Sequence, residues 1–348
     1  MVDAEGTICY SNGDIYKGYV VNGVRAGDGQ LIKPDGRILV GEWKEDKFVK
    51  GHLEFQNGAK YQGDHVDGIM NGTGKFTWKN GDEYSGSFQN DAMTGEGTLV
   101  LKDGKMKYAG TFTRCKMEGE FEVFYPDGEI WYKGEIHDNK WHGQGTLNAR
   151  TDGAGTYTGN FKNGHMSGNG EYVWLDGSKY SGHWRNSQFH GHGRMECKEY
   201  VYDGEYKDHQ KSGKGEITYP DGTVIEGFFS DDNLSDGSVI VRNPDGSILE
   251  MQIIDGVKCG LSYLYATHDI SDKKRSGVFI FNMEDDKPVG NALFYEADGD
   301  SLVAFGPMTM NTFDAVMTGA AALTAGLADI ASMAKQKSEA AELHGLYR

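Results

Sequence analysis

The chain has 348 residues, with 52 acidic and 35 basic side chains and a formal net charge of −17. Hydrophobic residues make up only 38%, whereas 51 residues are glycine, about twice the ordinary usage. The low hydrophobic content argues against a single large core. The acidic balance argues against nucleic acid, which is bound through basic contacts to phosphate, and against anionic membranes.

The N-terminal residues and the cysteines bear on where the protein resides. Residues 1–5 are polar and acidic, unlike a secretory signal peptide. No run of about 18 apolar residues occurs, so we expect no transmembrane helix. The cysteines are scattered without a CxxC pair, which predicts reduced thiols and a cytoplasmic protein. They are Cys9, Cys115, Cys197 and Cys259.

One short pattern recurs from residue 16 onward: Tyr-x-Gly-x-aromatic, with Gly-x-Gly beginning nine residues after its glycine. Tyr84, Gly86 and Phe88, followed by Gly95 and Gly97, form a clean copy. Copies follow one another every 22 to 25 residues, a period that indicates an array of structural repeats. The predicted structural positions are Tyr61, Gly63, Tyr84, Gly86, Phe88, Tyr108, Gly110, Phe112, Tyr132, Gly134, Tyr157, Gly159, Phe161, Tyr180, Gly182, Trp184, Tyr202, Gly204 and Tyr206.

Each repeat contains two predicted strands. In the first, Tyr84, Gly86 and Phe88 alternate, so a strand places them on one face. The glycine leaves a hollow that an aromatic ring from a neighbouring strand can cover. The second run, residues 97–101, also alternates like a strand.

Asx-Gly pairs separate these runs and supply the positive φ that tight hairpin turns need. Connections this short favour antiparallel pairing, because parallel strands need crossovers of about a dozen residues. The sequence therefore predicts an antiparallel meander. The pairs begin at Asn12, Asn22, Asp35, Asn57, Asp67, Asn80, Asp103, Asp127, Asn163, Asp176, Asp221 and Asp245.

These motifs resemble MORN repeats, the membrane occupation and recognition nexus family, over roughly residues 4–303. Some units depart from the family pattern. The unit of Tyr16 has Val20 where an aromatic is usual, and Leu39 replaces the tyrosine of the next unit. Tyr108 keeps its glycine, but Phe121 stands where Gly-x-Gly should end.

After about residue 227 the pattern decays, and an insertion is predicted at about 263–276, with the basic residues 273–275. Altered terminal units suit a repeat array, since the last hairpin lacks a neighbour on one side. Drift without function explains the decay equally well.

The tail, residues 304–348, changes character. Asn311 can cap a helix and Asp314 lies in its favourable first turn. An amphipathic helix is predicted over about 311–334. It either caps the last hairpins or recruits a partner or second copy. Its apolar stripe comprises Phe313, Val316, Ala320, Leu323, Leu327 and Ile330.

Catalytic chemistry is not expected. His183, His190 and His192 invite a metal-site interpretation, but His190 and His142 share one repeat position and favour a structural role. The Gly-x-Gly pairs open strands, so they are not phosphate cradles. We expect no metal, no cofactor and no enzyme. Some MORN relatives carry a lipid kinase or SET domain, for which the residues beyond the repeats are too few.

The predicted fold is therefore all-β: an elongated antiparallel meander of about a dozen hairpins, roughly 110–120 Å long, with a C-terminal α-helix. The resemblance implies a structural scaffold in cytoskeletal assemblies such as cilia or basal bodies, with extended or helical protein partners. It also implies homodimers through the C-terminal repeats. The alternative is a phospholipid-binding tether, for which basic residues at 44–50 and 273–275 are sparse evidence against the acidic whole.

Overall fold

The computed structural model describes residues 4–102, 106–150, 154–254, 257–270, 273–284, 287–296 and 302–307. Every regular element of these residues is a β-strand, and every pairing is antiparallel, which confirms the all-β meander. No helix long and apolar enough to cross a membrane occurs in this part of the chain. The helix predicted over 311–334 lies outside the described residues.

The chain divides into two compact units. The first comprises Met1–Leu147 with Lys162–Gly164, and the second comprises Asn148–Phe161 with His165–Arg348. The strands of the first unit are β1 (Ala4–Cys9), β2 (Ile15–Val21), β3 (Val24–Ile32), β4 (Ile38–Lys44), β5 (Lys47–Glu54), β6 (Lys60–Val66), β7 (Ile69–Thr77), β8 (Glu83–Gln89), β9 (Ala92–Val100), β10 (Lys107–Thr113), β11 (Lys116–Phe124), β12 (Ile130–His137) and β13 (Lys140–Ala149), whose last two residues belong to the second unit.

The second unit holds the remaining strands, apart from Lys162 at the end of the first of them. They are β14 (Gly155–Lys162), β15 (His165–Trp174), β16 (Lys179–Arg185), β17 (Gln188–Glu196), β18 (Val201–Lys207), β19 (Gln210–Thr218), β20 (Val224–Ser230), β21 (Asn233–Leu234), β22 (Gly237–Arg242), β23 (Ile248–Ile254), β24 (Val257–Ile270), β25 (Lys273–Glu284), β26 (Lys287–Glu296) and β27 (Leu302–Pro307).

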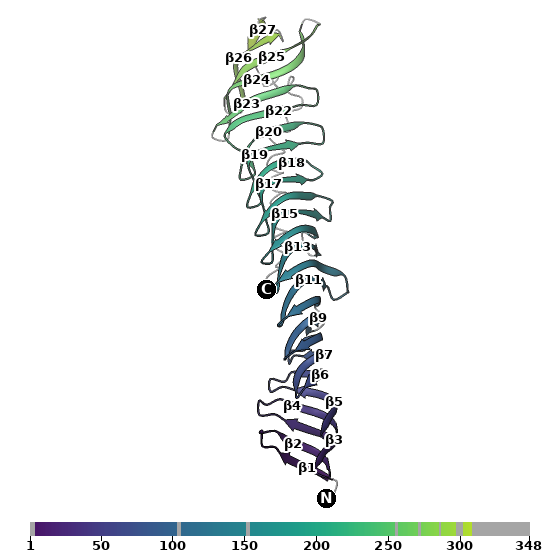
Figure 1. Cartoon of the computed structure of the whole chain (residues 1–348). Helices are drawn as coiled ribbons and strands as arrows, with labels where there is room; N and C mark the ends of the chain where they lie inside the picture. The colour runs from purple at the N-terminus through teal and green to yellow at the C-terminus, as the bar shows by residue number, and fades with distance from the viewer. Residues whose placement is uncertain are drawn as a thin grey trace. The chain divides into compact units, whose positions relative to one another are not determined.

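Within each unit, successive strands lie side by side in chain order (Figure 1). The register brings the repeat glycines together: Gly63 is opposite Gly74, which in turn is opposite Gly86. In the second unit, Gly170, Gly182 and Gly193 continue the same pattern. A row of glycines therefore crosses the strands of each unit at one level.

The core of each unit is a one-dimensional ladder of rings on one face of the sheet. Tyr84 and Phe88 are buried, whereas Ser85 between them points to the other face and is exposed. Phe88 packs edge-on against Tyr84 of its own repeat, at 5.2 Å between centroids, and against Tyr61 of the preceding repeat, at 5.0 Å. Edge-to-face pairs of this kind are favourable beyond the area they bury. Each ring thus links two repeats.

The Asx-Gly pairs form two kinds of turn, which corrects the uniform expectation from the sequence. Within a repeat, Asn163 and Gly164 both have positive φ, as a two-residue hairpin requires. Between repeats only the glycine does: Gly177 has φ +84°, while the Asp176 side chain accepts the Ser178 N–H at 2.8 Å. The second kind is an Asx-turn, and it recurs at Asn12, Asp35, Asn57, Asn80, Asp127, Asp221 and Asp245.

A second contact joins repeats through the hairpin turns. The second turn residue of most hairpins donates its N–H to a carbonyl at the start of a strand in the preceding repeat, as Asn139 does to Met117 at 3.3 Å. Its side chain accepts the N–H of that same residue, at 2.8 Å from the Asn139 oxygen. We call this reciprocal pair the turn clamp. Its side chain is provided in other repeats by Asp46, Asp91, Cys115, Ser187, His209 and Asp232.

Cys115 is the weakest side chain for this role, so Cys115→Asn should stabilise the protein. Its sulfur lies 3.4 Å from the Met93 nitrogen, and thiols are weak acceptors. Its φ of +66° also suits asparagine better than cysteine. We expect a gain of about 0.5–1 kcal/mol in the free energy of unfolding. Asn139→Ala should lower the free energy of unfolding by at least the same amount. If both variants melted at the same temperature as the parent protein, the turn clamp would be contradicted.

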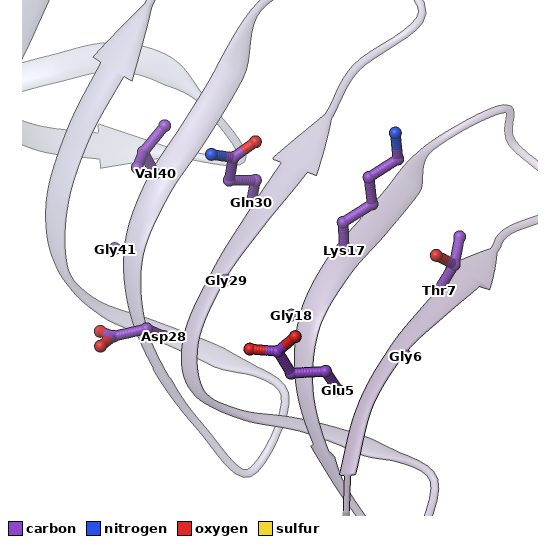
Figure 2. A pocket seen from close by; sticks show the side chains of 10 residues that line it. All are labelled: Glu5, Gly6, Thr7, Lys17, Gly18, Asp28, Gly29, Gln30, Val40 and Gly41. Carbon is purple, nitrogen blue, oxygen red and sulfur yellow. The ribbon is translucent and has the colours of Figure 1, made fainter.

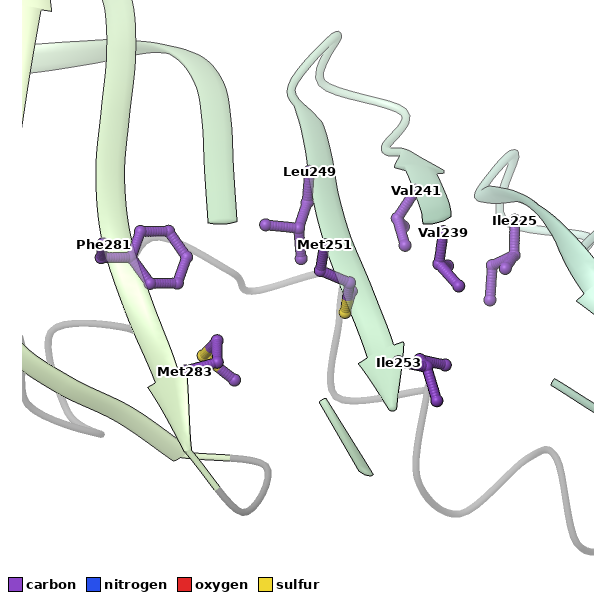
Figure 3. Packing of buried hydrophobic residues seen from close by; sticks show 8 residues of the cluster. All are labelled: Ile225, Val239, Val241, Leu249, Met251, Ile253, Phe281 and Met283. Atoms are coloured by element: carbon purple, nitrogen blue, oxygen red, sulfur yellow. The ribbon is translucent and has the colours of Figure 1, made fainter. Parts of the chain in front are cut away.

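The end of the second unit replaces rings with aliphatic side chains. A buried cluster is formed by Ile225, Val239, Val241, Leu249, Met251, Ile253, Phe281 and Met283 (Figure 3). The stretch predicted as an insertion at 263–276 continues the ladder, because β24 and β25 pair from Gly260 with Met283 to Ile270 with Lys273. The loss of the repeat motif after residue 227 therefore changes the packing but preserves the strand ladder.

Candidate functional site: a glycine-floored groove

A tyrosine lies against most pairs of opposing glycines. A Cβ atom on Gly74 would lie 2.4 Å from the Tyr61 hydroxyl oxygen, so no other residue fits there. The same hydroxyl donates to the Asp64 carbonyl at 2.7 Å. We call the side of the sheet that carries these rings the tyrosine face and the opposite side the outer face. The sequence predicts that a ring from a neighbouring strand covers the glycine. This is the arrangement at Gly74, whereas Gly63 is approached by the tyrosine of its own strand.

This arrangement recurs at most of the predicted structural positions. Hydroxyl donation to the carbonyl three residues onward is repeated by Tyr16, Tyr84, Tyr132, Tyr157, Tyr180 and Tyr202. The aromatic residues at the end of the motif are likewise buried: Phe88, Phe112, Phe161, Trp184 and Tyr206. A Cβ would collide at each motif glycine, namely Gly63, Gly86, Gly110, Gly134, Gly159, Gly182 and Gly204.

The repeat of Tyr108, whose sequence departs from the motif, also differs in structure. Phe121 takes the place of the second glycine, and its ring lies where a Cβ on Gly110 would come within 2.7 Å. Phe121 also packs edge-on against Phe112. Tyr108 itself stays partly exposed. One ring has thus substituted for another against the same glycine.

Burial on the tyrosine face changes the acidity of the phenols. Desolvation raises the pKa of Tyr61 to about 12, with a smaller contribution from Asp64. Desolvation also raises the pKa of Tyr84 to about 12. An ionised phenol loses more hydration than a neutral one, so the folded chain holds the proton more tightly.

The protein should therefore lose stability at alkaline pH. A tyrosine whose pKa is higher when folded than the ordinary value of about 10 contributes stability that is fully present below pH ~10. That contribution falls as the pH rises toward 12, because only the unfolded chain then releases the proton. Tyr61→Phe with Tyr84→Phe should unfold less steeply between pH 10 and 12 in circular dichroism. An unchanged alkaline transition would contradict the burial of these phenols.

The outer face carries a groove above the glycine row. Gly6, Gly18, Gly29 and Gly41 form its floor in the first unit (Figure 2). Thr7, Lys17, Gln30 and Val40 stand on one side of that row, and Glu5 and Asp28 stand on the other. Its volume is about 620 Å³. The groove exists because glycines leave the floor bare while the residues between them point outward.

The same groove recurs farther along the first unit, around Gly97 and Gly110, where its volume is about 700 Å³. Here it is acidic, with Glu96, Glu120 and Glu122 against a single lysine, Lys133. Glu122 and Lys133 form an ion pair at 2.9 Å. Both grooves are open and carry charged side chains, unlike the enclosed, mostly apolar pockets that bind small molecules. They are suited to a strand, loop or helix of another macromolecule.

The sequence did not indicate the outer-face residues, because they vary freely from repeat to repeat. Their place in the motif is the only signal in the sequence: they occupy the x positions beside the glycines of each repeat. Lys211 was also missed. It occupies the position held by Met93, Met117, Met166 and Phe189 in other repeats, yet it is only 1% exposed.

The histidines do not assemble a metal site. His183 contacts Asn169 at 3.3 Å, whereas His192 lies 3.2 Å from Asp203. Within the described ranges, no group of three or more His, Cys, Asp or Glu residues could hold a metal ion. The four cysteines are free and widely separated. The geometry offers a surface for binding.

The matches among solved structures are of low identity and low TM-score. Among solved structures, the chain matches the SAS-4 (dCPAP) TCP domain of Drosophila melanogaster bound to a proline-rich motif of Ana2 (dSTIL), at 11% identity and a TM-score of 0.14, over 72% of this chain and 90% of that one. It also matches apo AztD from Citrobacter koseri at 7% identity and a TM-score of 0.15, over 88% of each chain. No curated protein matches the chain.

The family model described as the MORN repeat matches eight segments: residues 16–36, 40–60, 61–83, 84–106, 132–148, 157–179, 180–199 and 202–224. Each match covers one strand–turn–strand unit or most of it, and every matched segment except 40–60 includes the tyrosine that precedes the paired glycines. The chain is therefore a MORN-repeat protein.

Proposed function

We propose that this protein is a non-catalytic scaffold that binds an extended protein partner along the outer-face groove, as part of a cytoskeletal assembly such as a cilium or basal body. The observation that carries the proposal is the glycine row. It repeats one groove at successive hairpins, so a long partner can make the same kind of contact several times. Repeat proteins use extended surfaces in this way, and repeated weak contacts add avidity without any single strong site.

The two faces of the sheet differ in what they offer a partner. The tyrosine face uses its rings to hold the repeats together, and Tyr61, Tyr84 and Tyr132 are at most 1% exposed. The outer face carries the polar and charged side chains, including Glu96, Glu120 and Lys133. A partner can bind there without disturbing the ring ladder. The acidic groove at Gly97 favours a partner segment that bears basic side chains.

The experiment fills the groove and leaves the ladder intact. Thr98 and Ala109 are opposite each other and both line the acidic groove. Thr98→Lys with Ala109→Glu adds bulk and a cross-strand charge pair without changing the net charge. Leu175→Lys, at a turn residue that is 84% exposed, is the control.

Partners are identified by proximity labelling in native cells and then tested as purified proteins. We expect the groove variant to bind the partner at least tenfold more weakly than the parent protein and to melt at the same temperature. The Leu175→Lys control should bind the partner as the parent protein does. Equal binding by all three proteins would contradict the proposal. Binding to phosphoinositide vesicles is measured by co-sedimentation. If the protein binds the vesicles more tightly than it binds the protein partner, and the groove variant binds them equally well, the lipid tether is favoured instead.

A further inference from the structure

The strand β1 has the sequence of the second half of a repeat. Its residues 5–7 are Glu-Gly-Thr, identical to residues 96–98 of β9. In that repeat β9 pairs with β8, which carries the tyrosine and the first glycine of the motif. β1 lies at the end of the first unit's ladder and pairs with β2 (Figure 1). Among the described residues, no strand occupies the place beside β1 that β8 occupies beside β9.

Gly6 of β1 also lacks the ring that lies against the equivalent glycine in complete repeats. Where both residues are kept, a Cβ on the second-strand glycine would lie at most 2.7 Å from the hydroxyl oxygen of the repeat's tyrosine. These glycines are Gly29, Gly74, Gly97, Gly145, Gly170, Gly193 and Gly215. A Cβ on Gly51, in the repeat where Leu39 replaces the tyrosine, would lie 2.7 Å from the Phe48 ring. A Cβ on Gly6 would meet one described atom within 4 Å, a Val20 methyl carbon at 3.6 Å. The tyrosine face beside Gly6 therefore has room for one ring.

The backbone of β1 leaves hydrogen-bonding groups free on the same side. Tyr10 donates its N–H to the Asp14 carbonyl at 2.9 Å, so these two residues form a bonded pair where β1 meets β2. Bonded and non-bonded pairs alternate in an antiparallel ladder, so the even-numbered residues of β1 bond to β2. The free N–H and C=O groups belong to Glu5, Thr7 and Cys9, all of which are exposed. An edge of this kind, without proline or a bulge, accepts an added strand.

We propose that the free edge of β1 binds an extended segment of another protein that carries a Tyr-x-Gly-x-aromatic sequence. The segment adds to the ladder as an antiparallel strand, and its tyrosine ring lies against Gly6. In this mode of recognition main-chain hydrogen bonds provide affinity, and the side chains that enter pockets provide specificity. The contact extends to β1 the strand pairing that already joins β8 to β9.

The register of the added strand follows from the complete repeat. Gly86 of β8 is opposite Gly97 of β9. The incoming glycine therefore lies opposite Gly6, and the tyrosine two residues before it lies opposite Ile8. The Tyr84 hydroxyl donates to a carbonyl of its own strand at 3.2 Å, so the incoming segment brings this acceptor with it.

A second copy of this chain fits the edge less well than a different protein. Its own β1 has the matching free backbone groups, but β1 contains no aromatic residue, so pairing two copies of β1 would leave Gly6 uncovered in both. The strands of a second copy that carry the tyrosine, such as β8, are paired on both sides. The proposed contact is also independent of partner binding in the outer-face groove, because it uses the edge and the tyrosine face.

A synthetic peptide of residues Glu83–Gln89 tests the edge in the full chain, with binding measured by fluorescence anisotropy. Gly6→Ala should bind the peptide at least about tenfold more weakly, because the new methyl group takes the place of the buried ring. This variant should melt at the same temperature as the parent protein, since its Cβ has only the 3.6 Å contact and φ is not positive. Thr7→Ala, which changes the adjacent outer-face side chain, is the control and should bind like the parent protein. Equal binding by Gly6→Ala and the parent protein would overturn the proposal.

Changes in the peptide test the ring and the backbone pairing separately. Tyr84→Ala in the peptide should weaken binding at least about tenfold, whereas Ser85→Ala should not weaken it. Ser85 is opposite Thr98, the counterpart of Thr7, so N-methylation of Ser85 removes a hydrogen bond to the edge. N-methylation of Tyr84, whose N–H points away from the edge, should be tolerated. An equal effect of the two methyl groups would contradict strand addition at β1.

Thiol alkylation locates the bound peptide. Cys9 on β1 and Cys115 in a distant hairpin turn are both exposed. Saturating peptide should slow the alkylation of Cys9 at least about fivefold, because the added strand lies beside it, and should leave Cys115 unchanged. Equal protection of both thiols would place the peptide elsewhere and overturn the proposal. A dimer in sedimentation that protects Cys9 and excludes the peptide would assign the edge to a second copy and overturn it as well.

Discussion

Gly182→Val is expected to lower the free energy of unfolding by at least about 3 kcal/mol. A Cβ at this position would lie 2.5 Å from the Gly193 Cα and 2.7 Å from the Tyr180 hydroxyl oxygen. The first clash is with backbone of the adjacent strand, so rotating a side chain cannot relieve it. Gly159 has the same surroundings, with a Cβ 2.5 Å from both the Gly170 Cα and the Tyr157 hydroxyl oxygen, and should behave alike.

Two controls separate this crowding from other effects of substitution. Ser181→Val changes the neighbouring residue, whose side chain points to the outer face and bonds Glu171, and should cost less than about 1 kcal/mol. Gly177→Ala tests backbone strain alone, because Gly177 has φ +84° and nothing within 4 Å of a Cβ; it should cost about 1–2 kcal/mol. Thermal melts of equal midpoint for Gly182→Val and Ser181→Val would show that the faces are assigned wrongly.

Removing one ring of the ladder should have a comparable effect. Tyr180 is fully buried and its ring is stacked on Phe189 at 3.8 Å between centroids. It forms T-shaped pairs with Trp184 and Tyr206, and its hydroxyl donates to the His183 carbonyl at 2.9 Å. Tyr180→Ala should cost about 3–5 kcal/mol. Tyr180→Phe, which removes only the hydrogen bond, should cost about 1 kcal/mol.

A double-mutant cycle shows whether the ring and the glycine act together. A Cβ on Gly193 would lie 2.4 Å from the Tyr180 hydroxyl oxygen, so Gly193→Ala alone should be strongly destabilising. After Tyr180→Ala the space is open, and Gly193→Ala should then add little. The two free-energy changes should therefore sum to at least about 1 kcal/mol more than the change in the double variant. Additive changes would mean that the ring does not lie against this glycine.

Periodicity predicted most of the fold because the forces that set it are local. Alternation along Tyr84, Gly86 and Phe88 determines which residues share a face, and short Asx-Gly turns determine antiparallel pairing. Phe121 was visible in the sequence as a departure, and the structure shows that its ring fills the space beside Gly110.

The turn clamp and the outer-face groove could not be predicted in the same way. The turn clamp joins residues about 21 positions apart, and Asp91, Cys115 and Ser187 share no side-chain type that a pattern would detect. The groove depends on where bare glycines lie relative to variable neighbours, which only the register reveals. The burial of Lys211 is a tertiary effect that contradicts the local preference of lysine for water.

Lysine footprinting of the chain bound to its purified partner tests the proposed scaffold most directly. Lys17, Lys75 and Lys133 line grooves at separate repeats of the first unit, whereas Lys79 lies at an exposed turn. If an extended partner occupies the glycine-floored groove, the acetylation of Lys17, Lys75 and Lys133 should slow together on binding, and Lys79 should react as before. Protection confined to one repeat, or protection of Lys79 equal to that of the three groove lysines, would contradict the account.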